Sequence, residues 1–286
     1  MNNMKPLRAY FGHHKCASSW LNAINLAVCR ELSLKLATVH SPVMFENNLD
    51  RFVEENQIDF LTYSNADIQF VRELDDFLGF HVIRDPRDIV VSAYFSHLYS
   101  HPTEGWPELV EHRKKLQNVN KEEGLFLEMK FSEKNFRNLY NWNYSQNNVL
   151  ELKVEEITPS PYEAIIKMMS FLELVQNDGR ASLKQRTKDL LGSVINRVST
   201  KSKGLLPIKI SKDKIPVNNL LGYVYKNRFS KMAEGRKKGD EDVKSHYRKG
   251  IAGDWVNHFN KDHTQFFKEN YNDLLIKLGY EKTPNW

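Results

Sequence analysis

The sequence predicts an α/β protein. Five apolar runs have the length and composition of β-strands, and each precedes a stretch with helical spacing or a helix-capping residue. These runs are residues 7–11, 34–39, 58–63, 80–84 and 149–154. A regular alternation of strands and helices is the pattern of the α/β class. The 286 residues are enough to bury a sizeable core, in one large domain or two small ones.

The composition limits the ligands and the compartment to expect. The chain has 41 basic and 36 acidic residues, and this net charge of +5 suits an anionic ligand but is too small to indicate nucleic acid. We expect no secretory signal, because the first residues lack an apolar core, and no apolar run is long enough to cross a membrane. Cys16 and Cys29 are the two cysteines, so reduced thiols in a cytoplasmic setting are expected.

A lysine and two serines follow the first strand. Residues 11–21 read FGHHKCASSWL, which places Lys15, Ser18 and Ser19 on the turn into a helix. Backbone N–H groups and the positive end of the helix dipole bind phosphate-like anions at such turns. The nucleoside-triphosphate loop differs, because it needs Ser or Thr directly after the lysine. Ordinary strand–helix packing is the alternative reading of this motif alone.

Caps and chain breaks define the next elements. Pro42 ends the strand 34–39, a short helix covers residues 49–55, and Ser64 to Asp67 start another helix after the strand 58–63. Residues 106–144 are predicted to form two helices that are split near residues 118–124. A helix at 161–174 carries Met168 and Met169, which we expect to fill the core.

A second polar junction follows the strand 80–84. Asp85 is a good N-cap, Pro86 suits the first helical position, and Asp88 lies three residues after the cap. Arg84 and Ser92 flank this junction, which therefore suits an anion. In the alternative reading, Arg84 pairs with a nearby carboxylate and Ser92 has no special role.

The last third of the chain contains an irregular segment and a basic loop. Residues 193–223 carry five lysines and few apolar repeats, which indicates either a lid over a binding site or a solvated surface. Residues 247–255 place Arg248 and Lys249 beside Gly250, as in loops that wrap a phosphate. Asp254 is expected to cap the final helices. Their predicted core residues are Trp255, Phe259, Phe266, Phe267 and Tyr271.

The three motifs together resemble those of the sulfotransferases that use 3′-phosphoadenosine 5′-phosphosulfate (PAPS). HHKCASSWL is similar to their 5′-phosphosulfate loop, VIRDPRDIVVSAYFSH to their 3′-phosphate motif and RKGIAGDWVNHF to their third motif. The motifs stand in the family's order and span roughly residues 7–260. The resemblance is to the cytosolic type, with a bacterial small-molecule enzyme as the expected kind. It implies one domain over residues 1–286, with a central, mostly parallel sheet flanked by helices and a P-loop-like nucleotide site.

The resemblance implies a role for each matching residue. Lys15 contacts the bridging and sulfonate oxygens and thus acts in catalysis. The remaining residues bind the nucleotide, with Ala17, Ser18 and Ser19 at the 5′-phosphate, and Trp20 and Phe229 on the two faces of the adenine. His14 and Cys16 complete the loop. The residues at the 3′-phosphate are Arg84, Ser92, Arg248, Lys249 and Gly250.

Two positions depart from the family's pattern. Ala17 replaces the usual glycine, so the turn is expected to avoid a positive φ there. Val154 stands where cytosolic members have a tyrosine that bonds to the adenine. Contacts to the adenine are therefore expected to differ more from the family than contacts to the phosphates.

The implied reaction is an in-line transfer of the sulfuryl group from PAPS to a hydroxyl or amine of a small-molecule acceptor. Negative charge grows on the bridging oxygen, and Lys15 with the N–H groups of the turn stabilises it without a metal. The product nucleotide is 3′-phosphoadenosine 5′-phosphate (PAP). Two alternatives remain, a P-loop kinase, which Cys16 after Lys15 disfavours, and a noncatalytic binder of nucleotides or acidic glycans. No nucleic-acid or membrane partner is expected.

The general base does not carry over from the family. The histidine of cytosolic members corresponds to Ser64, which is not a base. Asp67, just beyond the same strand, is the first substitute, followed by His40, whose imidazole suits proton transfer, and by Glu46, which resembles the acidic base of glycan sulfotransferases. The plainer readings are a helix cap, a turn residue and a solvated charge. The acceptor pocket is expected to involve residues 40–48, 64–69, 97–106 and 193–223.

Overall fold

Five parallel strands form the central sheet of the computed structural model, which describes residues 6–176 and 213–286. They run in the order β2-β3-β1-β4-β5, and each neighbouring pair is parallel. The predicted α/β class and the central parallel sheet are therefore confirmed. The strands are β1 (Leu7–Gly12), β2 (Leu36–Val39), β3 (Phe60–Ser64), β4 (Phe77–Ile83) and β5 (Val149–Lys153).

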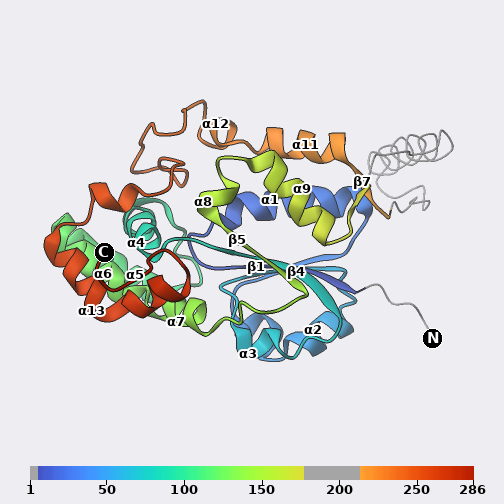
Figure 1. Cartoon of the computed structure of the whole chain (residues 1–286), viewed down its shortest axis with the longest axis horizontal. Coiled ribbons are helices and arrows are strands. Elements are labelled where there is room, and N and C mark those ends of the chain that lie inside the picture. The colour runs from blue at the N-terminus through green and yellow to red at the C-terminus, as the bar shows by residue number, and fades with distance from the viewer. Residues whose placement is uncertain (1–5, 177–212) are drawn as a thin grey trace.

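Helices cover both faces of this sheet (Figure 1). Those above one face in the figure are α1 (Ser18–Leu32), α8 (Val154–Ile157), α9 (Pro161–Phe171) and α11 (Val217–Lys226). Those below the other face are α2 (Leu49–Glu55) and α3 (Ile68–Val71). A third group stands to one side, namely α4 (Pro86–Phe95), α5 (Pro107–Gln117), α6 (Lys121–Phe131), α7 (Glu133–Asn141) and α13 (Lys261–Lys277).

Short elements complete the described part of the chain. A second small sheet pairs β6 (Val175–Gln176) with β7 (Ile215–Pro216) in parallel. The remaining turns are η1 (Pro42–Phe45), the π-helical turn η2 (Ser96–Ser100), α12 (Phe229–Met232) and η3 (Asp254–Asn257). No helix within residues 6–176 and 213–286 combines the length and the apolar character needed to span a membrane.

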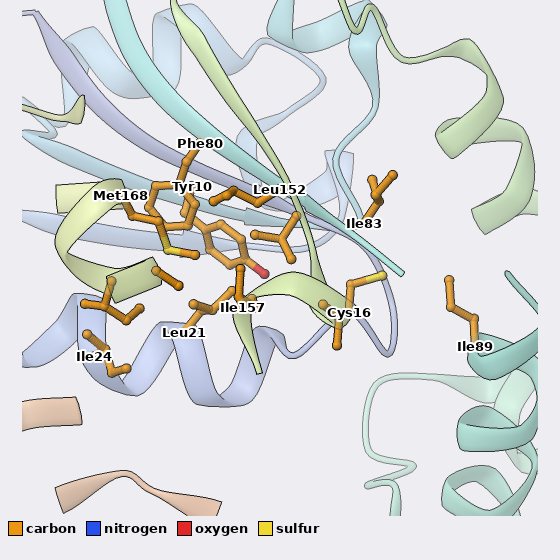
Figure 2. Packing of buried hydrophobic residues seen from close by; sticks show 14 of the residues in the cluster. Tyr10, Cys16, Leu21, Ile24, Phe80, Ile83, Ile89, Leu152, Ile157 and Met168 are labelled. Atoms are coloured by element: carbon orange, nitrogen blue, oxygen red, sulfur yellow. The ribbon is translucent and has the colours of Figure 1, made fainter. Parts of the chain in front are cut away.

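The two faces of the sheet pack into separate hydrophobic clusters, because neighbouring residues of a strand point to opposite sides. Tyr10 of β1 faces the larger cluster, and its neighbour Phe11 faces the smaller one. Figure 2 shows Tyr10 beside Phe80 of β4, over Leu21 of α1 and near Met168 of α9. Met168 and Met169 are fully buried, as predicted for core-filling residues.

The register brings the carboxyl ends of the strands to one edge. Gly12 at the end of β1 pairs with Ser64 of β3 and with Val82 of β4. The turns that follow these strands therefore lie side by side, which is where α/β sheets usually bind ligands. The turn around Lys15, the segment after Ser64 and the junction at Arg84 all start from this edge.

Three sequence predictions need correction. Residues 106–144 form three helices, because Gly124 lies inside α6 and a further break falls at Ser132. The irregular segment 193–223 lies outside the described residues up to position 212, and its last part is helical, since α11 begins at Val217. Asp254 is the first residue of η3, and Asn260 caps α13 through a reciprocal pair of bonds with His263.

Candidate active site

The turn between β1 and α1 is tight and contains two residues in the left-handed region. Lys15 has a φ of 64° and Ala17 a φ of 63°. The Cys16 N–H donates to the His13 carbonyl at 3.1 Å, which closes the turn before the first helical residue, Ser18. Lys15 and Ala17 thus alternate with Cys16, whose φ is not positive. Such an alternation turns successive N–H groups toward one side, a backbone arrangement that binds anions.

The positive φ at Ala17 overturns the expectation that the turn avoids this region there. The Ala17 carbonyl accepts bonds from Trp20 and Leu21, so it already belongs to the first turn of α1. The backbone thus keeps a conformation that favours glycine, although an alanine occupies it. Left-handed backbone costs a residue with a Cβ about 1–2 kcal/mol, and the packing around the turn offsets this cost.

The two serines of the turn are both engaged. Ser18 Oγ donates to the His13 carbonyl at 3.2 Å and lies 3.2 Å from the Tyr10 hydroxyl, which donates to it. Ser19 Oγ lies 3.0 Å from His246 Nε2, in the loop just before Arg248. The first motif therefore contacts the loop that leads into the third motif, although the two are far apart in the sequence.

Arg84 connects the second motif to the first. One of its terminal nitrogens donates to the Lys15 carbonyl at 3.4 Å, and the other lies 3.4 Å from the Asp88 carboxylate. Its Nε is enclosed and has no partner among the described residues. The pair between Arg84 and a carboxylate, which the sequence analysis offered as an alternative to anion binding, is thus present. The Nε–H of the guanidinium is still available as a donor.

Asp88 is the residue that joins the second and third motifs, a role that the sequence analysis missed. Its buried carboxylate accepts from the backbone N–H of Gly253 at 2.7 Å and from that of Trp255 at 3.0 Å. From the sequence, Asp88 was interpreted only as an acidic residue in the first turn of α4. The only signal for a second role was its position four residues after Arg84 in the RDPRD string.

Asp254 holds the two cations of the third motif. Arg248 and Lys249 each donate to one of its carboxylate oxygens at 2.6 Å. Burial alone raises the pKa of Asp254, but the bonds from Lys249, Asn257 and Arg248 outweigh burial and hold this pKa well below its usual range. The carboxylate therefore stays ionised and fixes both cations on one side of the site.

Phe229 lies against the loop of the third motif. A Cβ built on Gly250, whose φ is 70°, would stand 2.5 Å from the Phe229 ring. This close approach requires glycine at position 250. Phe229 and Gly250, both predicted to bind nucleotide, are thus in contact. Ser92 of α4 and Trp20 of α1 are half-buried, and Val154 is the buried first residue of α8.

The cations of the three motifs influence one another. Burial, together with the charges of Arg84 and Arg248, lowers the pKa of Lys15 to about 7. Crowded cations lower each other's pKa because each disfavours a further positive charge. A bound anion would remove this penalty, so the cluster is suited to a ligand with several negative charges.

The three predicted bases lie near the same edge of the sheet but differ in their contacts. Asp67 caps α3, because its carboxylate accepts from the Gln69 N–H at 3.1 Å. His40 is exposed at the end of β2, and Glu46 is exposed at the end of η1. These contacts agree with the noncatalytic interpretations, namely a helix cap, a turn residue and a solvated charge. The catalytic role of the three residues stays a prediction.

Several histidines, which the sequence analysis did not single out as a group, surround the turn. His14 Nε2 lies 2.9 Å from His97 Nε2, and His97 Nδ1 lies 3.0 Å from a carboxylate oxygen of the buried Glu128. His112 Nε2 reaches the same oxygen at 2.8 Å. These side chains come from η2, α5 and α6, so only the folded chain brings them together.

No protein-family model and no curated protein matches the chain. Among solved structures, that of mouse sulfotransferase SULT7A1 complexed with PAP matches with a TM-score of 0.52 and 15% identity, over 95% of this chain and 85% of that chain. Retinol dehydratase in complex with androsterone and inactive cofactor PAP matches with a TM-score of 0.49 and 13% identity, over 95% and 81%. The first match shows that this chain has the fold of a sulfotransferase.

Proposed function

We propose that this protein is a PAPS-dependent sulfotransferase that acts on a hydroxyl or amine of a small molecule. The observation that carries the proposal is the meeting of Lys15, Arg84 and Arg248 at the carboxyl edge of the sheet. Arg84 bonds to the Lys15 backbone, and burial, followed by the charges of both arginines, lowers the pKa of the Lys15 ammonium. This chain shares its fold with a sulfotransferase, and this likeness supports the proposal that the three cations bind the sulfuryl donor.

The turn around Lys15 would hold the phosphosulfate end of the donor. Its N–H groups and the start of α1 would face the anion, and Lys15 would add a charge beside the oxygen that bridges sulfur and phosphorus. As the acceptor attacks sulfur and the bridging bond breaks, negative charge moves to that oxygen. A positive group fixed there in advance lowers the barrier because it needs no reorganisation.

Arg84, Ser92, Arg248, Lys249 and Gly250 would bind the 3′-phosphate. The residues present fit this group, because Arg84 keeps an enclosed Nε without a partner and Gly250 leaves no room for a side chain beside Phe229. Asp88 and Asp254 act through these residues, since they fix the positions of the donors. The ring of Phe229 and that of Trp20 would enclose the adenine.

Two other functions compete with this proposal. A P-loop kinase needs a hydroxyl ligand for magnesium directly after the lysine, whereas the Cys16 thiol is fully buried and bonds to the His14 carbonyl at 3.7 Å. A noncatalytic anion binder would use the same half-buried lysine and its neighbouring cations, so turnover of PAPS is the observation that separates it from the enzyme. We therefore assign the charge-stabilising role to Lys15 and none to a metal. Two free, buried thiols, Cys16 and Cys29, fit our proposal of a cytoplasmic location.

The proposal is tested by measuring the formation of PAP from PAPS. Chromatography quantifies the PAP formed when water, alcohols, phenols or amines are supplied as acceptors. A chain that neither binds PAP in calorimetry nor forms it from PAPS is not a sulfotransferase. Binding of PAP without any turnover would favour the noncatalytic alternative. ATP-dependent phosphorylation of an acceptor would favour the kinase.

The 3′-phosphate assignment has a separate test. Removing a charge-assisted contact to phosphate costs about 1.5–3 kcal/mol, so Arg248→Ala should weaken PAP binding by roughly 10- to 100-fold. Adenosine 5′-monophosphate lacks the 3′-phosphate, and its affinity should change far less. Calorimetry with both ligands decides, and an equal loss for the two would place Arg248 away from the 3′-phosphate.

A further inference from the structure

His14 stands at the start of a chain of polar contacts that ends at an enclosed carboxylate. Its Nε2 meets His97 Nε2 at 2.9 Å, and His97 Nδ1 meets Glu128 Oε2 at 3.0 Å. Glu128 is fully buried, and His97 is 1% exposed. The carboxylate also accepts from His112 Nε2 at 2.8 Å and from Ser132 Oγ at 3.3 Å. Five side chains from the turn after β1, η2, α5, α6 and the break at Ser132 thus form one network.

The network determines which nitrogen of each ring carries a proton. Burial by itself raises the pKa of Glu128, but the rings of His97 and His112 lower it to about 2, so the carboxylate is ionised. An ionised carboxylate accepts only, and His97 must therefore donate from Nδ1. When the His97 ring carries a single proton, that proton is on Nδ1, so its Nε2 accepts and the His14 Nε2 donates. The lone pair of neutral His14 is consequently left on Nδ1.

Nδ1 of His14 is the open end of this network. No described residue forms a hydrogen bond with it, and it is not among the enclosed polar atoms that lack a partner. His14 is half-buried and precedes Lys15 in the turn. Burial, above all, holds the pKa of His14 well below its usual range. The ring is therefore neutral near pH 7, and its free lone pair belongs to the residue directly before Lys15.

We propose that His14 Nδ1 is the general base of the transfer, and that His97 and Glu128 are positioning residues behind it. This inference rests on the proposed sulfotransferase function. The acceptor oxygen forms a bond to sulfur, the bond from sulfur to the bridging oxygen breaks, and its electron pair stays on PAP. The acceptor proton moves to His14 Nδ1. The imidazolium then donates from Nε2 to His97, and the Glu128 charge stabilises it through that ring.

The other candidate groups offer less support for a base. His101 Nδ1 bonds to the neutral carbonyl of Pro102 at 2.8 Å, and His246 Nε2 is engaged by Ser19. Asp67 caps a helix, and His40 and Glu46 are exposed. The trio of His97, His112 and Glu128 also has the donor types of a metal site. Its contacts of 2.8 and 3.0 Å are ordinary N–H···O bonds, so hydrogen bonding accounts for them.

The decisive variant is His14→Gln, which keeps a donor toward His97 but has no basic nitrogen. We expect the kcat for PAP release from PAPS to fall by about 10²–10⁴-fold with phenol or water as the acceptor. With 4-nitrophenol, whose hydroxyl is already largely ionised in mildly alkaline buffer, the fall should be much smaller. PAP binding in calorimetry should change only a few-fold. Unchanged turnover with phenol, or equal losses with both phenols, would overturn the assignment.

Two further measurements separate a base from a structural part. In His14→Ala, added imidazole should restore turnover, and a lack of any rescue together with intact PAP binding counts against the proposal. The acid limb of the parent's kcat against pH should vanish in His14→Gln. In Glu128→Gln it should move to lower pH, because the imidazolium loses a stabilising charge. The groups that face His14 are Lys15, His97, His101 and His246, so the same profile is recorded for His101→Gln.

The earlier candidates enter the same assay as Asp67→Asn, His40→Gln and Glu46→Gln. Near-parental turnover in these three, beside a slow His14→Gln, supports His14. A dead Asp67 or His40 variant beside an active His14→Gln transfers the role to that residue. If the parent itself forms no PAP, the proposed function fails, and this outcome differs from a failure of His14 alone.

Discussion

At the scale of the residue, Ala17 shows a conflict between local preference and the site. Its φ of 63° suits glycine, and the conformation costs alanine about 1–2 kcal/mol. Ala17→Gly should remove this cost and lose about 0.4–1 kcal/mol to the greater freedom of the unfolded chain. We expect a net gain of about 0.5 kcal/mol in the free energy of unfolding.

The matched control for this prediction is Ala23→Gly. Ala23 lies inside α1, where glycine destabilises a helix by about 1 kcal/mol. Urea unfolding of the two variants should therefore give changes of opposite sign. Two losses of similar size would mean that the turn imposes no strain on Ala17.

Lys15 gives the second prediction at this scale. Lys15→Ala should fold normally but form PAP from PAPS about 10²–10³-fold more slowly, the usual loss when one group that stabilises the transition state is removed. Lys114→Ala is a suitable control, because that lysine is exposed and pairs with Glu111 on the surface of α5. If Lys15→Ala turns over within a few-fold of the parent, Lys15 does not carry the developing charge.

At the scale of the element, one carboxylate ties α4 to the loop before η3. Asp88 accepts from the Gly253 and Trp255 N–H groups and from Arg84. Asp88→Asn keeps the shape but turns an NH₂ group toward one of these donors. We expect the free energy of unfolding to fall by about 1–3 kcal/mol, and PAP binding to weaken because the third motif loses its anchor.

Asp273→Asn serves as the comparison for Asp88→Asn. Asp273 is exposed on α13, where substitutions change stability by about 0.5 kcal/mol or less. Thermal unfolding with and without PAP measures both effects. If Asp88→Asn lowers the stability but leaves PAP affinity unchanged, the link between α4 and the third motif is structural only.

At the scale of the whole molecule, buried histidines make stability depend on pH. His13 is fully buried, and burial followed by the charge of His81 holds its pKa well below the usual range. Below about pH 6.5 the unfolded chain binds a proton that folded His13 does not. The unfolded state is then favoured by up to about 1.4 kcal/mol per pH unit, so stability from this residue falls as the pH falls below 6.5.

His13→Gln should therefore reduce the loss of unfolding free energy between pH 6.5 and 5.5 by about 1 kcal/mol. The readout is the slope from urea unfolding at several pH values, which stays meaningful even if the variant is less stable throughout. His40→Gln is the control, because that side chain is exposed. The same slope in the parent and in His13→Gln would show that His13 is protonated in the folded state.

Much of the fold follows from the sequence because its signals are local. Apolar runs, caps and proline positions predicted the five strands and most of the helices, and Asp85 caps α4 as expected. The helix break at Ser132 was missed because it carries no glycine or proline. The motifs around Lys15, Arg84 and Arg248 could also be recognised from the sequence, since each occupies one continuous stretch of chain.

Only the tertiary structure decided how these three motifs contact one another. Parallel pairing places the ends of β1, β3 and β4 at one edge, and the chain of bonds from Arg84 through Asp88 to Gly253 then joins the second and third motifs. The contact of His14, His97 and Glu128 spans more than a hundred residues. No local pattern encodes such a contact, because it depends on burial and pairing between distant elements. The sequence by itself determined the residue types at the site, and the fold determined which of them act together.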